Sequence, residues 1–305
     1  MTKERLYVYD TTLRDGQQTQ GVQFSLAEKQ QIAATLDALG VDYIEGGWPG
    51  ANPIDSAWFD SQPKLRATFT AFGMTKRAGH SAENDTALNA VVNANTAAVC
   101  LVGKTHDFHV ETALGITLDE NIENIRRSIE HLVSQGREAL FDAEHFFDGY
   151  KANPDYARAC IQAAFAAGAR WIVLCDTNGG ALPAEVGQIV QEVITAGLPG
   201  DHLGIHTHND TENAVANTLA AIDAGARHIQ GTLNGLGERC GNANLTSLLP
   251  ILKLKEPYRS HYEIGITDEA LRDLKRASRV LDDILNRIPA PQAAFVGASA
   301  FVHKA

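Results

Sequence analysis

Short apolar runs alternate with longer amphipathic segments along almost the whole chain. The apolar runs have the length of β-strands and fall at residues 6–10, 42–45, 67–71, 97–102, 139–143, 171–175, 203–206 and 228–232. Helical periodicity marks residues 26–39, 119–134, 155–167, 184–195 and 212–224. Several helical segments end in a glycine (Gly40, Gly168 and Gly225), and in each case a strand follows within a few residues.

Eight strand-and-helix units in succession, with no linker between them, predict an α/β fold with parallel strands joined by crossover helices. Eight is the number that closes a (β/α)8 barrel, the TIM barrel. A doubly wound open sheet is the alternative, but the first strand-to-helix turn lacks a glycine-rich phosphate fingerprint. We expect the barrel over residues 1–265. A C-terminal helical extension over residues 266–305 is expected to serve as a dimerisation or linker element.

Composition and charge narrow the possible partners. Acidic residues outnumber basic ones, 37 to 26, giving a formal net charge of −11 without any Lys or Arg cluster that could follow a nucleic acid backbone. The N-terminus has no apolar targeting segment and no stretch reaches transmembrane length, so we expect a cytoplasmic protein that binds neither nucleic acid nor membrane. Four widely spaced cysteines, with no C-x-x-C, indicate neither disulfides nor a zinc knuckle.

Polar residues collect where the predicted strands end, which is where a TIM barrel carries its chemistry. Asp15 follows the first strand, Glu45 ends the second, Glu144 follows the fifth, Thr177 the sixth and Asn242 the eighth. If these residues were only solvated loop positions, they would have no reason to favour one end of the strands. The active site is therefore expected at the C-terminal face.

His206 and His208 stand two residues apart at the end of the seventh strand. Alternate strand residues point to the same side, so both imidazoles can reach one point. Such a pair is weak evidence for a metal when it is taken alone. Asp15 and Asn242 add two oxygen donors, and the four residues form a candidate shell for a hard or borderline divalent ion.

Arg14 adjoins Asp15 and would place a permanent positive charge beside the ion, useful where a carboxylate, enolate or alkoxide must be stabilised. A salt bridge to Glu45 or Glu144 is a structural alternative that does not exclude this role. Glu144 lies in an acidic, aromatic stretch where burial could raise its pKa toward that of a general acid or base. Thr177 could hydrogen-bond a carboxylate.

Three segments, residues 10–18 (DTTLRDGQQ), 206–210 (HTHND) and 237–245 (GERCGNANL), resemble the signatures of the metal-dependent Claisen condensation and lyase superfamily. Its members include 2-isopropylmalate, homocitrate and citramalate synthases and hydroxymethylglutaryl-CoA lyase. The resemblance implies the following roles: catalytic Arg14 and Glu144; substrate-binding Arg14, Gln18, Glu45 and Thr177; and one divalent ion (Mg²⁺, Mn²⁺ or Zn²⁺) held by Asp15, His206, His208 and Asn242.

Residues 43–50, 103–110, 141–150 and 174–180 are similar to the citramalate synthase branch of this family. Gly47-Trp48 departs from the corresponding Glu-Val-Gly-Phe-Pro type of isopropylmalate synthases. Trp48 could favour a small keto acid or could pack beneath its loop, and the sequence leaves both open. The implied partners are acetyl-CoA and a small 2-keto acid, most simply pyruvate, condensed to citramalate in isoleucine biosynthesis. A different keto acid, a lyase reaction, or a vestigial site are the alternatives, and the complete ligand set argues against the last.

Residues 295–305 resemble the segment that leads, in these synthases, into a linker subdomain and a regulatory domain. The later subdomain usually contributes a residue to a neighbouring protomer's active site. The resemblance therefore implies a homodimer, and it implies poor turnover and no feedback inhibition for these 305 residues alone.

Overall fold

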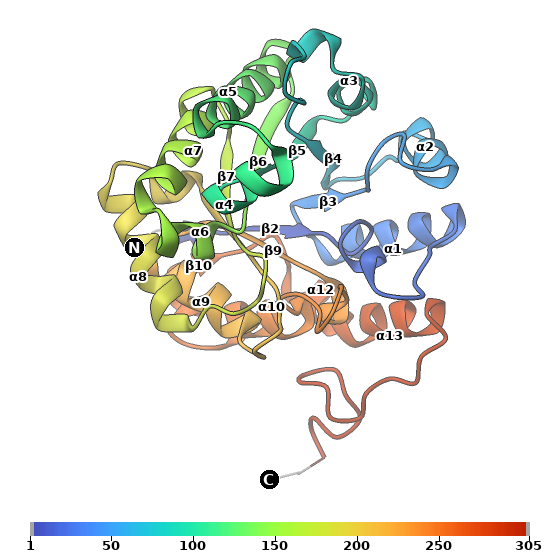
Figure 1. The fold of residues 1–305 in the computed structure, drawn as a ribbon. Coiled ribbons are helices and arrows are strands. Elements are labelled where there is room, and N and C mark those ends of the chain that lie inside the picture. The colour runs from blue at the N-terminus through green and yellow to red at the C-terminus, as the bar shows by residue number, and fades with distance from the viewer. Residues whose placement is uncertain (1–2, 303–305) are drawn as a thin grey trace.

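The computed structural model describes residues 3–302 and confirms the predicted TIM barrel. Eight parallel strands close on themselves in chain order (Figure 1). They are β2 (Tyr7–Asp10), β3 (Tyr43–Glu45), β4 (Thr68–Met74), β5 (Ala98–Lys104), β6 (Glu138–Glu144), β7 (Trp171–Asp176), β8 (Leu203–Thr207) and β9 (His228–Gly231). The barrel closes where β2 pairs with β9, with Tyr7 beside His228. All eight carboxyl ends therefore open on one face.

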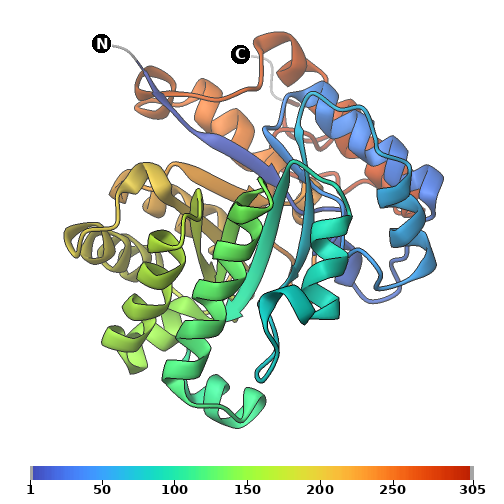
Figure 2. The same cartoon turned by 90° about the horizontal axis from the view of Figure 1, so that it is seen from above.

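Helices form a ring outside the strands (Figures 1 and 2). The five predicted helices are present as α1 (Leu26–Leu39), α5 (Leu118–Ser134), α7 (Pro154–Ala166), α8 (Pro183–Thr195) and α9 (Ala214–Ala224). The pattern did not predict α2 (Pro53–Asp60), α3 (Thr86–Asn93), α4 (Asp107–His109), α6 (Phe146–Ala152) and α10 (Leu245–Leu254). Single-turn helices are η1 (Gly16–Gln18), η2 (Ala82–Asn84), η4 (Gly200–His202) and η5 (Leu233–Gly235), and η3 (Val110–Leu114) is a π-helix.

Local sequence signals set the helix ends. Ser25 and Glu28 form a capping box at the start of α1, each satisfying a backbone N–H of the other. The glycines predicted to stop helices all have positive φ, 91° at Gly40, 101° at Gly168 and 125° at Gly225. A residue with a Cβ rarely adopts this conformation, so glycine ends the helix and turns the chain toward the next strand.

The barrel wall separates an outer apolar core, packed between strands and helices, from a smaller interior cluster. The interior cluster contains Tyr9, Tyr43, Phe72, Ala98, Cys100, Leu140, Trp171, Val173 and Cys175. Side chains alternate along each strand, so the buried polar residues Glu45, Asp142, His206 and Gln230 face the same interior. The interior is thus polar where it approaches the carboxyl ends of the strands.

The C-terminal part of the chain packs on the barrel. It contains α11 (Tyr258–His261), β10 (Tyr262–Glu263), which pairs with β1 (Glu4–Arg5), α12 (Asp268–Arg272) and α13 (Leu274–Ile284). α13 lies along α1 with Leu274, Ala277 and Leu281 buried (Figures 1 and 2). Asn234, in the loop after β9, donates to the Ser278 carbonyl at 3.0 Å. The boundary between residues 265 and 266 stays a prediction, and residues 1–2 and 303–305 lie outside the described part.

Two expectations concern the whole described chain. Within residues 3–302, no helix is both long and apolar enough to cross a membrane. All four cysteines are free thiols, with Cys100, Cys160 and Cys175 buried and Cys240 exposed.

A buried lysine joins the first two strand-to-helix loops. Lys29, on the apolar face of α1, donates to the carbonyls of Leu13 at 3.2 Å and Gly46 at 3.1 Å. Its third hydrogen bond goes to Asp55 Oδ1 at 2.5 Å. The ammonium group has three hydrogens, so its hydrogen-bonding capacity is met without water. Lys29 therefore holds the backbone of both loops in one place.

We expect Lys29→Met to lower the free energy of unfolding by about 3–5 kcal/mol, because it leaves the buried Asp55 carboxylate without its cation. Urea unfolding followed by circular dichroism measures the change. Lys64→Met is the matched control, since Lys64 is exposed and its loss should change stability by less than about 0.5 kcal/mol. Equal stabilities of the two variants would contradict the role of Lys29.

Candidate active site

Three of the predicted metal ligands meet at the C-terminal face of the barrel. One donor atom from each of Asp15, His206 and His208 lies within 4.8 Å of the other two. Asp15 Oδ2 is 3.0 Å from His206 Nε2 and 3.9 Å from His208 Nε2, and the two Nε2 atoms are 3.4 Å apart. All three side chains are buried. The strand-end pattern thus brought together residues that are up to 193 positions apart in sequence.

Strand alternation explains why both imidazoles face the site. His206 is the fourth residue of β8, and Thr207 points to the opposite side, where its hydroxyl donates to the Ala214 carbonyl at 3.0 Å. His208 then returns to the inner face and forms an isolated backbone bridge with Asn242. The end of β8 and the loop after β9 are therefore fixed to each other at the site.

Asn242 lies against the same cluster. Its Nδ2 is 3.0 Å from Asp15 Oδ2 and 3.1 Å from His206 Nε2. Its Oδ1 is buried without a hydrogen-bond partner among the described residues and packs so close to Gly237 that a Cβ there would lie 1.8 Å away. Rotating the amide by half a turn would direct Oδ1 toward Asp15 and the imidazoles. Asn242 thus fits the predicted fourth ligand.

The electrostatics of the cluster favour a cation. Burial raises the pKa of Asp15, but Arg14 and the hydrogen bond to His206 outweigh it and hold that pKa below its usual range. Burial, together with the charge of His206, lowers the pKa of His208 to about 3, so its imidazole is neutral near pH 7. Burial lowers the pKa of His206, but the hydrogen bond and the negative charge of Asp15 outweigh burial, so the net shift of this pKa is upward. An ionised carboxylate and imidazole nitrogens that face one another form the donor set that divalent ions prefer.

Arg14 lies between the cluster and an aromatic wall. Its Nε donates to Glu45 Oε2 at 2.6 Å, and its Nη1 is 3.4 Å from Asp15 Oδ2. The guanidinium stacks on Phe72, 4.0 Å from the ring centroid, and Trp48 packs edge-on against that ring with centroids 6.0 Å apart. The salt bridge between Arg14 and Glu45 that the sequence left open is present. Trp48 does not stack on Arg14 directly, because the Phe72 ring lies between them.

Glu45 is held at this position from both sides. It is completely buried, and its Oε1 accepts a hydrogen bond from the Tyr9 hydroxyl at 2.8 Å. Burial raises the pKa of Glu45, while the Arg14 charge opposes that shift. Lys29 donates to the backbone carbonyls of Leu13 and Gly46, the residues next to Arg14 and Glu45, and so ties together the two segments that carry this pair.

The other predicted residues lie farther from the cluster. Glu144, at the end of β6, keeps 24% of its side-chain surface exposed and pairs with Lys104 at 2.6 Å. It is thus less buried than the sequence suggested. The Thr177 hydroxyl accepts from the His145 N–H at 2.8 Å, which leaves its own hydrogen free to donate. Gln18 is exposed at the end of η1. No polar contact in the described structure joins these three side chains to the metal donors.

Sequence reasoning missed Gln230, whose Oε1 lies 2.7 Å from His206 Nδ1. It also missed that Asp142 accepts a hydrogen bond from Gln230 at 3.0 Å. The available signal was the alternation in β9, where His228 and Gln230 fall on the same side of a short buried strand. A polar pair on one side of a buried strand indicates a polar barrel interior.

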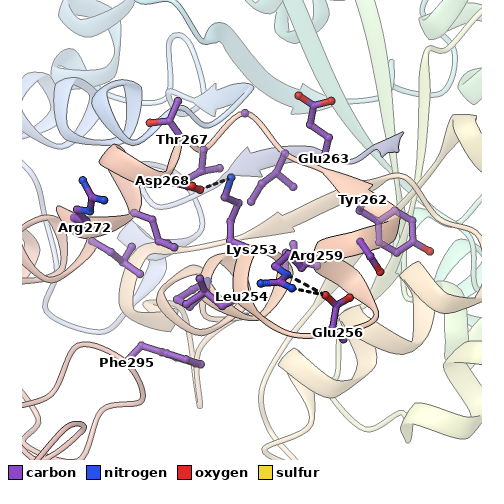
Figure 3. Close-up of a pocket in the computed structure, with 18 of the residues that line it drawn as sticks. Lys253, Leu254, Glu256, Arg259, Tyr262, Glu263, Thr267, Asp268, Arg272 and Phe295 are labelled. Carbon is purple, nitrogen blue, oxygen red and sulfur yellow. Dashed lines mark hydrogen bonds and ion pairs between the residues drawn. The ribbon is translucent and has the colours of Figure 1, made fainter. Parts of the chain in front are cut away.

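A large cavity lies elsewhere on the molecule. It has a volume of about 1580 Å³ and is lined by α10, β10, α12 and residues near the C-terminal end, including Phe295 (Figure 3). Several of its charged groups are paired with each other, Lys253 with Asp268 and Arg259 with Glu256, each at 2.9 Å. None of the predicted site residues lines it. The polar cluster at the strand ends, and not this cavity, is therefore the candidate active site.

The curated relatives include (R)-citramalate synthases and, at lower identity, 2-isopropylmalate synthases. The chain is 48% identical to the (R)-citramalate synthase of Synechocystis sp., over 99% of the chain and 56% of that protein. It is 33% identical to the 2-isopropylmalate synthase of Caulobacter vibrioides, over 99% of the chain and 56% of that protein. The chain therefore spans about half the length of the curated relatives it matches.

Among solved structures, an HMG-CoA lyase from Acinetobacter baumannii, in complex with coenzyme A and 3-methylmalate, aligns with 100% of both chains. The TM-score is 0.81 and the sequence identity 21%, which supports the barrel fold. The HMGL-like family matches residues 5–277, most of the chain. The resemblance drawn from the sequence motifs is thus confirmed, and the chain belongs to the HMGL-like family.

Proposed function

We propose that this protein condenses acetyl-CoA with a 2-keto acid, pyruvate being the preferred acceptor, to give citramalate and CoA. The observation that carries the proposal is the convergence of Asp15, His206 and His208 beside Arg14. This combination offers a cation site and a fixed positive charge, which a reaction through an anionic enolate requires. The similarity to (R)-citramalate synthases supports this choice of substrates.

The reaction joins the methyl carbon of acetyl-CoA to the keto carbon of the acceptor. The methyl group gives up a proton, the keto oxygen gains one, and water then cleaves the thioester to release CoA. Asp15, His206, His208 and Asn242 would hold a divalent ion, Mg²⁺, Mn²⁺ or Zn²⁺, and the ion would supply Lewis acidity toward the acceptor.

The residues around the metal site have separate proposed roles in oxyanion stabilisation, acid–base catalysis and substrate binding. Arg14 stabilises the oxygen that becomes negative, and Glu45 orients Arg14 and lines the acceptor site. Glu144 is the proposed acid–base residue, and Thr177 and Gln18 contact the substrates. The free hydrogen of the Thr177 hydroxyl suits a carboxylate acceptor.

The aromatic wall favours a small acceptor. Trp48 and Phe72 close the side of the site next to Arg14, and an indole there leaves less room for a branched keto acid. An apolar wall discriminates by only about 1–3 kcal/mol per methylene, so the preference for pyruvate should be graded. A 2-isopropylmalate or homocitrate synthase reaction, or cleavage of a hydroxyacyl-CoA by a lyase, is the alternative.

A CoA-release assay with a thiol reagent tests the proposal. We expect release from acetyl-CoA with pyruvate, less with 2-oxobutyrate, and still less with 2-oxoisovalerate, 2-oxoglutarate or glyoxylate. A chelator should abolish it. Calorimetry of pyruvate binding in Mn²⁺ provides a second readout that does not depend on turnover. If another keto acid bound more tightly than pyruvate and gave faster CoA release, the assigned acceptor would change. Cleavage of a hydroxyacyl-CoA without condensation would favour the lyase reaction.

Three further assignments belong to the same proposal. We propose a homodimer, a cytoplasmic location and a role in isoleucine biosynthesis. The role in isoleucine biosynthesis is supported by the relatives named as (R)-citramalate synthases, because citramalate is the product proposed for this chain. The helical extension beyond residue 265 is proposed as the part that contributes to the dimer.

A further inference from the structure

A hydrogen-bonded chain crosses the barrel interior behind the metal donors. His206 Nδ1 lies 2.7 Å from Gln230 Oε1, and Gln230 Nε2 donates to Asp142 Oδ1 at 3.0 Å. The three residues come from β8, β9 and β6, and each is at most 4% exposed. These side chains have almost no contact with bulk solvent, so their hydrogen bonds are made mainly to each other.

Asp142 fixes which way the Gln230 amide faces. Gln230 Nε2 is the amide atom that faces Asp142, and an ionised carboxylate, which only accepts hydrogen bonds, holds the NH₂ group in that direction. The amide oxygen then points toward His206, and an oxygen can only accept. When the His206 imidazole carries a single hydrogen, as a metal-ligating imidazole does, that hydrogen must therefore reside on Nδ1.

This tautomer leaves the Nε2 lone pair of His206 directed at Asp15 and His208, 3.0 and 3.4 Å away. Without the Gln230 oxygen, the neutral imidazole would place its hydrogen on Nε2 instead. It would then donate to the ionised Asp15 carboxylate, and that hydrogen bond would compete with the ion for both groups.

We propose that Gln230 and Asp142 are positioning residues that hold His206 in its metal-ready tautomer. The inference rests on the proposed metal site and is independent of which keto acid is used. It predicts that changes at Gln230 or Asp142, which are not among the donors of the cluster, weaken metal binding. Second partners of ligating histidines typically contribute 10–100-fold in metal affinity.

Two single variants test the proposal by Mn²⁺ calorimetry at pH 8. Gln230→Met removes the acceptor at nearly constant size, and we expect Mn²⁺ affinity to fall by about 10–100-fold. Asp142→Asn keeps the shape but lets the Gln230 amide face either way, and a smaller loss of several-fold is expected. Nitrogen-15 NMR of the metal-free proteins, at a pH high enough for His206 to carry a single hydrogen, should report Nδ1–H at His206 in the wild type and Nε2–H in Gln230→Met.

A double variant provides a rescue. Gln230→Glu combined with Asp142→Asn exchanges the carboxylate and the amide. The introduced carboxylate accepts from His206 Nδ1, and the introduced amide donates to it, so the tautomer and at least wild-type affinity should return. Val173→Ala is the control for packing damage, because Val173 is buried in the same interior but lies outside the chain of hydrogen bonds.

The outcomes are separable. If wild-type protein binds no Mn²⁺, the proposed metal site is wrong. If the wild type binds and Gln230→Met and Asp142→Asn bind equally well, the positioning role is wrong and the metal site stands. If Gln230→Met does not fold, Asp142→Asn and the double variant decide: loss in the first without recovery in the second also contradicts the proposal.

Discussion

His208→Ala is expected to abolish Mn²⁺ binding and CoA release together. The substitution removes one of three donors that lie within 4.8 Å of each other, and no other His, Cys, Asp or Glu in the described structure completes the group. The neutral state of the buried His208 imidazole means that the wild-type ligand is available without losing a proton at pH 7. Calorimetry measures the metal affinity, and the thiol assay measures turnover on the same preparation.

His202→Ala is the matched control for this result. His202 precedes β8 at the opposite end of the strand, where its Nδ1 contacts the Arg170 carbonyl. It should keep both metal binding and activity. Wild-type Mn²⁺ affinity in His208→Ala would remove His208 from the ligand set, and loss of activity with metal still bound would give it a different role.

The barrel could be predicted because every strand is an apolar run and every long helix has a regular period. The errors fall where those signals are weak. α2 and α3 have only eight residues each, too few to display a clear period, and α2 begins at Asn52-Pro53, which also suits a turn. β4 runs to Met74, beyond the predicted end at residue 71, because pairing with β5 extends it.

The site could be predicted only in part. Asp15, His206 and His208 follow from strand alternation and from the rule that strand ends share one face. The partners behind them do not follow, because Gln230 and Asp142 are 88 residues apart and meet across the barrel interior. The burial of Lys29 could have been predicted, because it lies on the same face of α1 as the apolar residues Ile32, Ala33 and Leu36. Only the structure shows which backbone carbonyls it reaches.

Arg14→Ala is expected to leave Mn²⁺ bound and to lower the rate of CoA release by at least about two orders of magnitude, as loss of an oxyanion donor does. Arg14 is not among the donor atoms of the metal cluster, but its Nη1 lies 3.4 Å from Asp15, close to where an acceptor oxygen would bind. The measurement is kcat and KM for pyruvate, with Mn²⁺ affinity determined in parallel. A rate within about tenfold of wild type would contradict the role given to Arg14.

Stability has to be separated from chemistry in this variant, because Arg14→Ala leaves Glu45 buried without its cation. Breaking a buried pair in this way costs about 3–5 kcal/mol. The double variant Arg14→Ala with Glu45→Gln removes the unpaired charge, while the introduced amide can still bond to the Tyr9 hydroxyl. We expect it to regain most of the lost stability and none of the rate. Recovery of the rate along with the stability would mean that Arg14 acts by holding the fold, since a stabilising charge for the reacting oxygen would still be missing.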